Sequence, residues 1–497
     1  MMRRRFALAA GYSFVGFAAT GCRTSQPVRN ATPPPATILR ASAQAPANDG
    51  SARAEAPLPI RDANIDLTSA LEMAGAANPT IALARETVVE ALARRQEAYA
   101  LVLPSFTAGA NVRIHTGPVQ RSGGAILGVD SQSLYFGSGA RAVGTGTVAI
   151  PGVRAVYPFA DVVLGRQLVR QRIAAVRGDS AAVQNLTLLD VATTYLGLLE
   201  ADAALEALRR GETDFAEIAR VTAQYAKAGQ GRDADARRAE ANLELLRQKW
   251  EEVRGERGAA SARLAGMLSL DPTQGLIPPG GRLYPFGFFD SATDLDSLVA
   301  QALRNRPEVN ARAAEVAESN IRLRQEHLRP WLPTVGFGFS VGSFGGGSDL
   351  TGTGYGGFGT RTDFDAVAVW NVQNLGFGNR ALQHRGRARV GQAVARLDST
   401  KNRIRDEVAD SLAQIRSELS RIETARKQLA TAQEGFAEEL VRIKQGEGRP
   451  LEVLDSTRQL TESRLEMIRA ITGHNVAQFR LLAAVGTPPG TAAPSAR

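Results

Sequence analysis

The sequence predicts a mainly α-helical protein that also contributes strands to a membrane β-barrel. Three observations support this class: two parts of the chain resemble each other, long segments lack proline, and two glycine-rich segments carry alternating apolar residues. Similarity at a fixed spacing is typical of repeated structural units, and a run without helix breakers favours a long helix. Alternation with a period of two indicates strands that have one apolar and one polar face.

The composition excludes several functional classes. The chain has 497 residues, of which 44% are hydrophobic and 22% charged, so it can bury a core. The net charge is +9, but the first 60 residues carry +5 of it, and the remaining charge is too dispersed for a nucleic-acid surface. Cys22 is the only cysteine, which excludes an internal disulfide and cysteine-based zinc sites. The 4 histidines are isolated in the sequence, and we expect no metal, cofactor or catalytic centre.

The N-terminus has the parts of a secretory signal peptide over residues 1–21. Basic residues precede an apolar stretch that is too short for a transmembrane helix, and small residues stand directly before Cys22. This pattern resembles the bacterial lipobox, although Ala19 stands where leucine is preferred, and it implies that Cys22 becomes a lipid-modified N-terminus. An ordinary signal peptide followed by an incidental cysteine is the alternative. Residues 22–65 are rich in proline and alanine and are predicted to be a lipid-anchored tether.

The rest of the chain contains two internal repeats. Asp66 and Pro79 recur as Asp294 and Pro307, 228 residues later. The glycine-rich turn near Gly229 recurs 217 residues later. Agreement at nearly constant offsets near both ends of each copy predicts one structural unit in two copies. The predicted divisions are repeat 1 over residues 66–271, a connector over 272–293, repeat 2 over 294–488 and a disordered tail over 489–497.

Both repeats are predicted to contain the same order of elements. A helix of about 35 residues ends at a Leu-Pro pair, a β-hairpin follows, and a very long helix then turns into a returning helix. At 1.5 Å per residue, a helix of 66 residues is about 100 Å long and needs neighbouring helices along its length. The hairpins are predicted over residues 104–160 and 333–372, the long helices over 161–226 and 379–445, and the returning helices over 232–269 and 451–485.

The predicted strands favour a barrel that several chains share. Apolar residues alternate with polar or small residues over residues 106–114 and 335–341. Four strands per chain are too few for a membrane barrel, because about eight is the smallest number that closes. Open sheet edges are not tolerated in a bilayer, so the strands must pair with those of other chains, and the long helices would form a tube beneath the barrel. The alternative is a periplasmic helical scaffold anchored through Cys22, in which the glycine-rich segments are loops.

Several motifs together resemble one family. Asn78-Pro79, Leu103-Pro104, the segment 370–378 and the turns of both repeats are similar to those of the outer-membrane efflux proteins, the TolC-like channels, over residues 66–488. The resemblance implies a homotrimer in which each chain gives four β-strands to a shared twelve-stranded barrel, above a periplasmic α-barrel of long antiparallel helices. It implies a passive exit duct in the outer membrane. Its partners would be a periplasmic adaptor (membrane fusion) protein and an inner-membrane pump of a tripartite efflux or type I secretion system, with small molecules or proteins as cargo.

The resemblance also implies functional residues at the two turns between long and returning helices. Glu452 and Asp455 match the paired acidic residues that narrow the tunnel mouth of the family, and their spacing puts both on one helix face. In a trimer they would form a ring that favours cations. The alternative is that acidic side chains simply suit the first turn of a helix. The glycines of the turns, where an adaptor would dock or where the helices merely reverse, are Gly229, Gly231, Gly446 and Gly448.

Two glycine motifs are not assigned a function. Residues 338–342 fit the G-x-S-x-G pattern and residues 354–359 fit G-x-G-x-x-G, but no helix is predicted directly after either. The chain is therefore predicted not to be an enzyme.

Overall fold

The computed structural model describes residues 63–138, 153–229, 231–279, 283–445 and 449–491. All of them lie in the larger of two units, Pro59–Arg497. The predicted signal peptide, Cys22, Gly446 and Gly448 lie outside the described residues. Among the residues described, no helix combines the length and apolar character needed to cross a membrane.

The first predicted helix is in fact two helices, because the chain turns at Asn78. The extended backbone of Asn78 separates α1 (Leu67–Ala77) from α2 (Pro79–Ala100). Its Oδ1 accepts hydrogen bonds from two backbone N–H groups in the first turn of α2, at 2.8 and 3.4 Å. Proline suits this first turn but could not continue α1. The expectation of one helix of about 35 residues is therefore wrong.

The second half has the same break at Arg306. This residue separates α5 (Leu295–Asn305) from α6 (Pro307–Leu328) and is buried. Its guanidinium group donates to the carbonyl oxygen of Ala483 at 3.1 Å and forms an ion pair with Glu407 at 2.6 Å. The prediction of one continuous helix is wrong here too, since a buried arginine and a proline together hold the turn.

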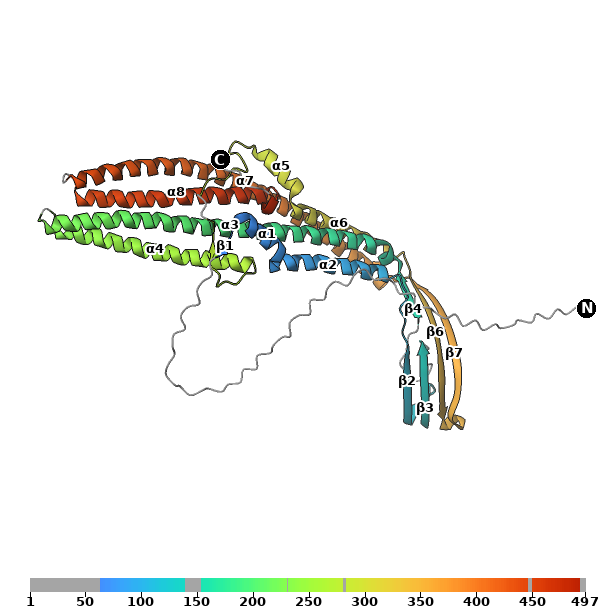
Figure 1. Cartoon of the computed structure of the whole chain (residues 1–497). Helices are drawn as coiled ribbons and strands as arrows, with labels where there is room; N and C mark the ends of the chain where they lie inside the picture. The colour runs from blue at the N-terminus through green and yellow to red at the C-terminus, as the bar shows by residue number, and fades with distance from the viewer. Residues whose placement is uncertain (1–62, 139–152, 230, 280–282, 446–448, 492–497) are drawn as a thin grey trace, which may run out of the picture. The chain divides into compact units, whose positions relative to one another are not determined.

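The four longest helices form two antiparallel hairpins. They are α3 (Phe159–Lys227) with α4 (Asp233–Met267), and α7 (Phe377–Lys444) with α8 (Pro450–Ala484). α3 also contacts α8, so the hairpins lie side by side (Figure 1). With 69 residues, α3 is about 100 Å long. It buries side chains from Ala160 to Thr222, because α2, α4, α6 and α8 all pack against it.

The connector between the two halves is fastened to α8 by buried amide side chains. Asn475 Oδ1 accepts a hydrogen bond from the N–H of Phe286 at 2.8 Å. Gln478 Oε1 accepts from the N–H of Phe289 at 2.9 Å, and its Nε2 donates to the carbonyl of the same residue at 3.0 Å. These side chains satisfy backbone groups that burial would otherwise leave without partners. Phe286 then packs with Phe479 in the main core.

Two segments predicted to lack regular structure are partly ordered. β1 (Ala63–Asn64) pairs in parallel with β5 (Leu276–Ile277), and the neighbouring Ile65 is buried in the main core. The short 3-10 helix η3 (Pro489–Thr491) contacts α1, α3 and α8. The predicted tether over 22–65 and tail over 489–497 are thus a few residues too long, because apolar partners distant in sequence hold these ends.

Five strands form an antiparallel sheet where the helices end (Figure 1). They are β2 (Gly109–Gln120), β3 (Ile126–Ser138), β4 (Val153–Pro158), β6 (Thr334–Ser348) and β7 (Thr353–Val369). β7 pairs along one edge of β6, and β3 and β4 pair with successive parts of its other edge. Because β3 and β4 occupy the same position beside β6, the sheet is four positions wide. The structure describes five strands, whereas four were predicted. The 3-10 helices η1 (Asp349–Thr351) and η2 (Gln373–Gly376) precede β7 and α7.

Candidate functional site

The register of the sheet collects the alternating apolar residues on one face. Residues that pair directly across two strands lie on the same face. Phe339 pairs with Phe364 of β7 and with Val153 of β4. Ile114 and Phe364 each expose 70% of their surface, so this apolar face is uncovered in the single chain. The other apolar side chains on it are Ala110, Val112, Leu134, Phe136, Ala155, Val335, Phe337, Val341, Ala366 and Ala368.

The opposite face is mainly polar or made of glycine. Arg361 and Asp363 form an ion pair on it at 2.8 Å. The register places these further polar and small residues there: Asn111, Arg113, His115, Ser131, Ser133, Arg154, Gly336, Gly338, Ser340 and Asp365. One side of the sheet is thus predominantly apolar and the other predominantly hydrophilic, which suits lipid and water respectively. The hydrophilic side also carries the exposed apolar residues Val156, Phe344, Val367 and Val369.

The two outer strands of the sheet have unpaired edges. β2 pairs with β3 alone and β7 with β6 alone among the described strands, and they are 12 and 17 residues long. Their outer N–H and C=O groups are available to strands of another chain.

Exposed aromatic and aliphatic side chains gather where the sheet meets the helices. Trp331 precedes β6 and exposes 78% of its surface, and Trp370 follows β7 and exposes 59%. The other exposed residues of this junction are Leu101, Leu103, Phe106, Phe159, Val372, Leu375 and Phe377. Tryptophan is enriched at membrane–water interfaces. Sequence reasoning missed this junctional belt, although two of the 3 tryptophans flank predicted strands.

The turn between α3 and α4 contains two of the predicted docking glycines. Gly229 has a φ of +72°, which favours glycine over other residues. A Cβ atom at Gly231 would lie 3.2 Å from the backbone nitrogen of Ala226, so a side chain there would require the backbone to shift by a few tenths of an ångström. Both glycines are explained by the turn itself, and adaptor docking stays a prediction.

The tips of the two helical hairpins are held together. Tyr225 near the end of α3 donates its hydroxyl hydrogen to the carbonyl oxygen of Ile443 in α7 at 2.8 Å. A buried apolar cluster drawn from all four helices lies beside this bond. Its members are Phe215, Ile218, Val221, Ala239, Ile443, Val453 and Leu454.

Glu452 and Asp455 lie on the exposed side of α8 near this tip. Val453 and Leu454 between them are buried in the tip cluster, which fixes the orientation of the helix. The Asp455 carboxylate forms an ion pair with Arg458 at 2.9 Å. Sequence reasoning missed this partner, although its i, i+3 spacing is visible in the sequence. The tunnel-mouth role of the two acidic residues stays a prediction, and Arg458 would offset part of their charge.

A cavity of about 350 Å³ lies between α3, α4 and α8, with Glu200, Glu256 and Arg469 among its lining residues. Burial raises the pKa of Glu200, Arg469 partly offsets this rise, and Glu256 adds to it. The interior of the hairpin pair therefore contains a carboxyl group that binds its proton more tightly than usual.

The glycine motifs and histidines form no chemical centre in the described part of the chain. Residues 338–342 lie within β6 and residues 354–359 within β7, far from any helix N-terminus that could bind phosphate. No group of three His, Cys, Asp or Glu side chains in the described ranges could hold a metal ion.

Long helical hairpins that lead into an amphipathic sheet define a class of membrane channels among solved structures. A membrane protein from Pseudomonas aeruginosa is similar with a TM-score of 0.69 and 19% identity, over 89% of this chain and 99% of that one. The CmeC outer membrane channel of Campylobacter jejuni has a TM-score of 0.68 at 13% identity, over 84% and 85% of the two chains. The open state of the MtrE outer membrane channel of Neisseria gonorrhoeae has a TM-score of 0.63 at 18% identity, over 85% and 89%. The chain therefore has the fold of TolC-like outer-membrane channels.

The family comparison covers part of the second half of the chain. Residues 298–487 match the model of the outer membrane efflux protein family. The resemblance predicted from the sequence is thus confirmed, and so is the mainly helical class of the fold. A search of curated proteins finds no match. The efflux family and the two named channels are not enzymes, which is consistent with the prediction that the chain is not an enzyme.

Proposed function

We propose that the chain is a passive exit duct of the bacterial outer membrane. The observation that carries this proposal is the sheet, which presents a predominantly apolar face and, among the described strands, leaves the outer edges of β2 and β7 unpaired. An uncovered apolar face suits contact with lipid, and a bilayer requires the two edges to be paired by other copies. The helices begin where the sheet ends, so the hairpins would extend into the periplasm (Figure 1).

Three copies explain the width of the sheet better than two. Two copies of a sheet four positions wide would close an eight-stranded barrel, whose interior is filled by side chains. Three copies would close a twelve-stranded barrel, which leaves room for a lumen lined by the polar face. In both halves two shorter helices precede the strands and a long helix with its returning helix follows them, which supports two repeats of one unit. The first half has three described strands and the second has two.

We infer that partner proteins supply the energy for transport. A periplasmic adaptor would dock on the tips near Gly229 and Gly231, with Gly446 and Gly448 at the second tip. An inner-membrane pump would drive small molecules or proteins through the duct, in tripartite efflux or type I secretion. Glu452 and Asp455 would line the periplasmic mouth, where three copies would favour cations.

A lipid on Cys22 would anchor the N-terminus to the outer membrane. We expect Cys22→Ser to abolish the mass increase of a lipid-modified N-terminus and to leave conductance unchanged, because the shared barrel alone suffices for insertion. Mass spectrometry of the purified protein checks the first part. An unmodified Cys22 in the wild type would contradict the anchor and leave the duct intact.

The duct is tested by planar-bilayer conductance, together with the mass of the purified protein in detergent. Discrete, long-lived current steps from a trimer are the expected result. A well-folded monomer without conductance would instead support the alternative, a lipid-anchored periplasmic scaffold. In that case the apolar face of the sheet would need another cover.

A further inference from the structure

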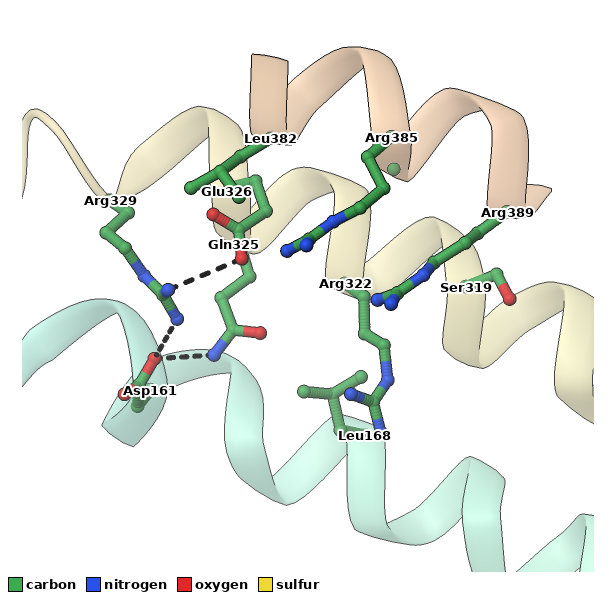
Figure 2. Close-up of a pocket in the computed structure, with 11 residues that line it drawn as sticks. Asp161, Leu168, Ser319, Arg322, Gln325, Glu326, Arg329, Leu382, Arg385 and Arg389 are labelled. Carbon is green, nitrogen blue, oxygen red and sulfur yellow. Dashed lines mark hydrogen bonds and ion pairs between the residues drawn. The ribbon is translucent and has the colours of Figure 1, made fainter. Parts of the chain in front are cut away.

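A pocket of about 290 Å³ lies between α3, α6 and α7, close to the sheet. Four arginines line it: Arg322 of α6, Arg329 directly after α6, and Arg385 and Arg389 of α7. Two acidic residues, Asp161 and Glu326, face them. In Figure 2 the side chains of Arg385 and Arg389 extend from α7 toward the space between α6 and α3. The lining itself carries two more positive than negative charges, and Glu318, which pairs with Arg322 from outside the lining, reduces this excess to one.

The two arginines of α6 and its C-terminal end have acidic partners, whereas the two arginines of α7 have none in the described part of the chain. Arg329 forms an ion pair with Asp161 at 3.1 Å, and Arg322 forms one with Glu318 at 2.7 Å. In the described part of the chain, Arg385 and Arg389 have no hydrogen-bond or ion-pair partner. Their i, i+4 spacing puts two like charges on one helix face, where they repel each other. A bound anion would remove this repulsion and accept hydrogen bonds from both guanidinium groups.

The pocket also contains an acceptor without a donor. Glu326 pairs with Arg329 through Oε1 at 3.4 Å, but its Oε2 is buried and accepts no hydrogen bond. A buried oxygen without a donor is costly, so a ligand that brings its own donor to this position would be favoured. A ligand that combines an anionic group with a hydrogen-bond donor fits both features.

The position of the pocket brings it near the junctional belt of exposed aromatic and aliphatic residues. Arg329 lies 5 residues before β6, and Asp161 lies 3 residues after β4. At 1.5 Å per residue, Arg385 lies about 12 Å along α7 from its first residue, Phe377. If the sheet spans the outer membrane, the pocket opens at the depth of the periplasmic lipid headgroups or just beyond them.

We propose that this pocket binds a phosphate group accompanied by a hydrogen-bond donor. Arg385 and Arg389 hold the phosphate oxygens, since the planar guanidinium group matches phosphate geometry. The donor reaches Glu326 Oε2. Two ligands share this chemistry: a phospholipid headgroup that carries an ammonium group, and free hydrogen phosphate, whose P–OH group is the donor. The lipid source rests on the proposed function, whereas the free phosphate does not.

The test measures ligand affinity of the full-length protein in a detergent with a sugar headgroup. Thermal unfolding is followed while sodium phosphate, sodium sulfate or short-chain phosphatidylethanolamine is added at pH 7.5 and constant ionic strength. We expect phosphate or the phospholipid to bind more tightly than sulfate, which has the same shape but no proton to donate. Arg385→Gln with Arg389→Gln should weaken this binding about tenfold or more, because two charge-assisted contacts are lost. Arg380→Gln with Arg387→Gln removes the same charge from α7 outside the pocket and should change affinity less than about twofold.

Two further variants separate binding from folding. Arg385→Lys with Arg389→Lys keeps the charge but loses the guanidinium geometry, and we expect an intermediate affinity. Glu326→Gln replaces one acceptor with an amide that also donates, so the preference for phosphate over sulfate should narrow. These readouts depend on the ligand and would not follow from a general loss of stability.

The outcomes test the proposed phosphate site and show whether its ligand is free phosphate or a phospholipid headgroup. Binding of free phosphate, of the phospholipid or of both, weakened by the pocket variant and not by the control, supports the proposal and identifies the ligand. Equal effects of the two double variants, or no binding of either ligand, would overturn it. Dissociation of the oligomer by the pocket variant alone would also overturn it, since acidic side chains of a second copy would then fill the pocket. Conductance of the same wild-type preparation tests the proposed duct separately.

Discussion

One hydroxyl group links the tips of the two helical hairpins and should control how easily they separate. Tyr225 donates to the carbonyl oxygen of Ile443 at 2.8 Å, in the last turn of α7. Carbonyl groups in the last turn of a helix lack their usual partners within the helix, so the tyrosine provides one. Tyr225→Phe keeps the aromatic ring and removes this hydrogen bond. We expect the free energy of local opening to fall by about 1 kcal/mol, which makes opening about fivefold more frequent.

Amide hydrogen exchange of residues 225–229 in the full-length protein measures this opening. Tyr195→Phe is the matched control, because Tyr195 lies on the same helix but in the main core. If three tips open together in the proposed trimer, the combined change of about 3 kcal/mol would raise the open fraction more than about a hundredfold, which single-channel conductance would detect. Unchanged exchange at the tip, or equal changes in both variants, would refute the reasoning.

Three further predictions concern the tip, the connector and the interior. Glu452→Gln with Asp455→Asn should weaken the cation preference of the channel. Arg458→Gln should strengthen this preference, because it leaves the Asp455 carboxylate without its ion-pair partner. Equal ion selectivity of both variants would show that these residues do not line the mouth of the channel. Gln478→Leu should lower the thermal unfolding midpoint, at a cost of about 3 kcal/mol, because it leaves buried backbone groups of the connector without partners. Burial raises the pKa of Glu200 above its usual 4.5, so the folded state holds this proton more tightly than the unfolded state does. The folded state therefore loses stability as the pH rises from 4.5 through the higher pKa of the folded state. Glu200→Gln should therefore gain stability relative to the wild type as the pH rises above 4.5, and a constant difference in unfolding midpoint would contradict this.

The breaks at Asn78 and Arg306 show where sequence reasoning meets its limit. The following prolines are visible in the sequence, but proline fits the first turn of a new helix as well as it ends an old one. What decides between these cases is the partner of the preceding side chain. Asn78 donates to the carbonyl of Met267, and Arg306 reaches Ala483, both more than 170 residues away. Such partners follow from the packing of the helices and not from local sequence.

The position of the acidic pair could be predicted from the sequence, whereas the arginine pocket could not. Glu452 and Asp455 share a helix face, which their spacing alone predicts, and the structure has both exposed on α8. The arginine pocket combines side chains of three helices. The junctional belt contains Trp331 and Trp370, which are separated in sequence by β6 and β7 but flank the same end of this strand pair. No spacing in the sequence indicates either group, because the members of the pocket meet only after the helices have packed and those of the belt only after the strands have paired.

The sequence by itself determined the kinds of element: the long helices, the amphipathic strands and the glycine turns. These depend on local properties, namely the period of apolar residues, the absence of proline and the backbone freedom of glycine. The tertiary structure alone decided which strand edges stay open, how the apolar residues of five strands share one face, and where unpaired arginines meet. These features depend on pairings between residues far apart in the chain, such as Phe339 with Val153, whose energies no local pattern reports.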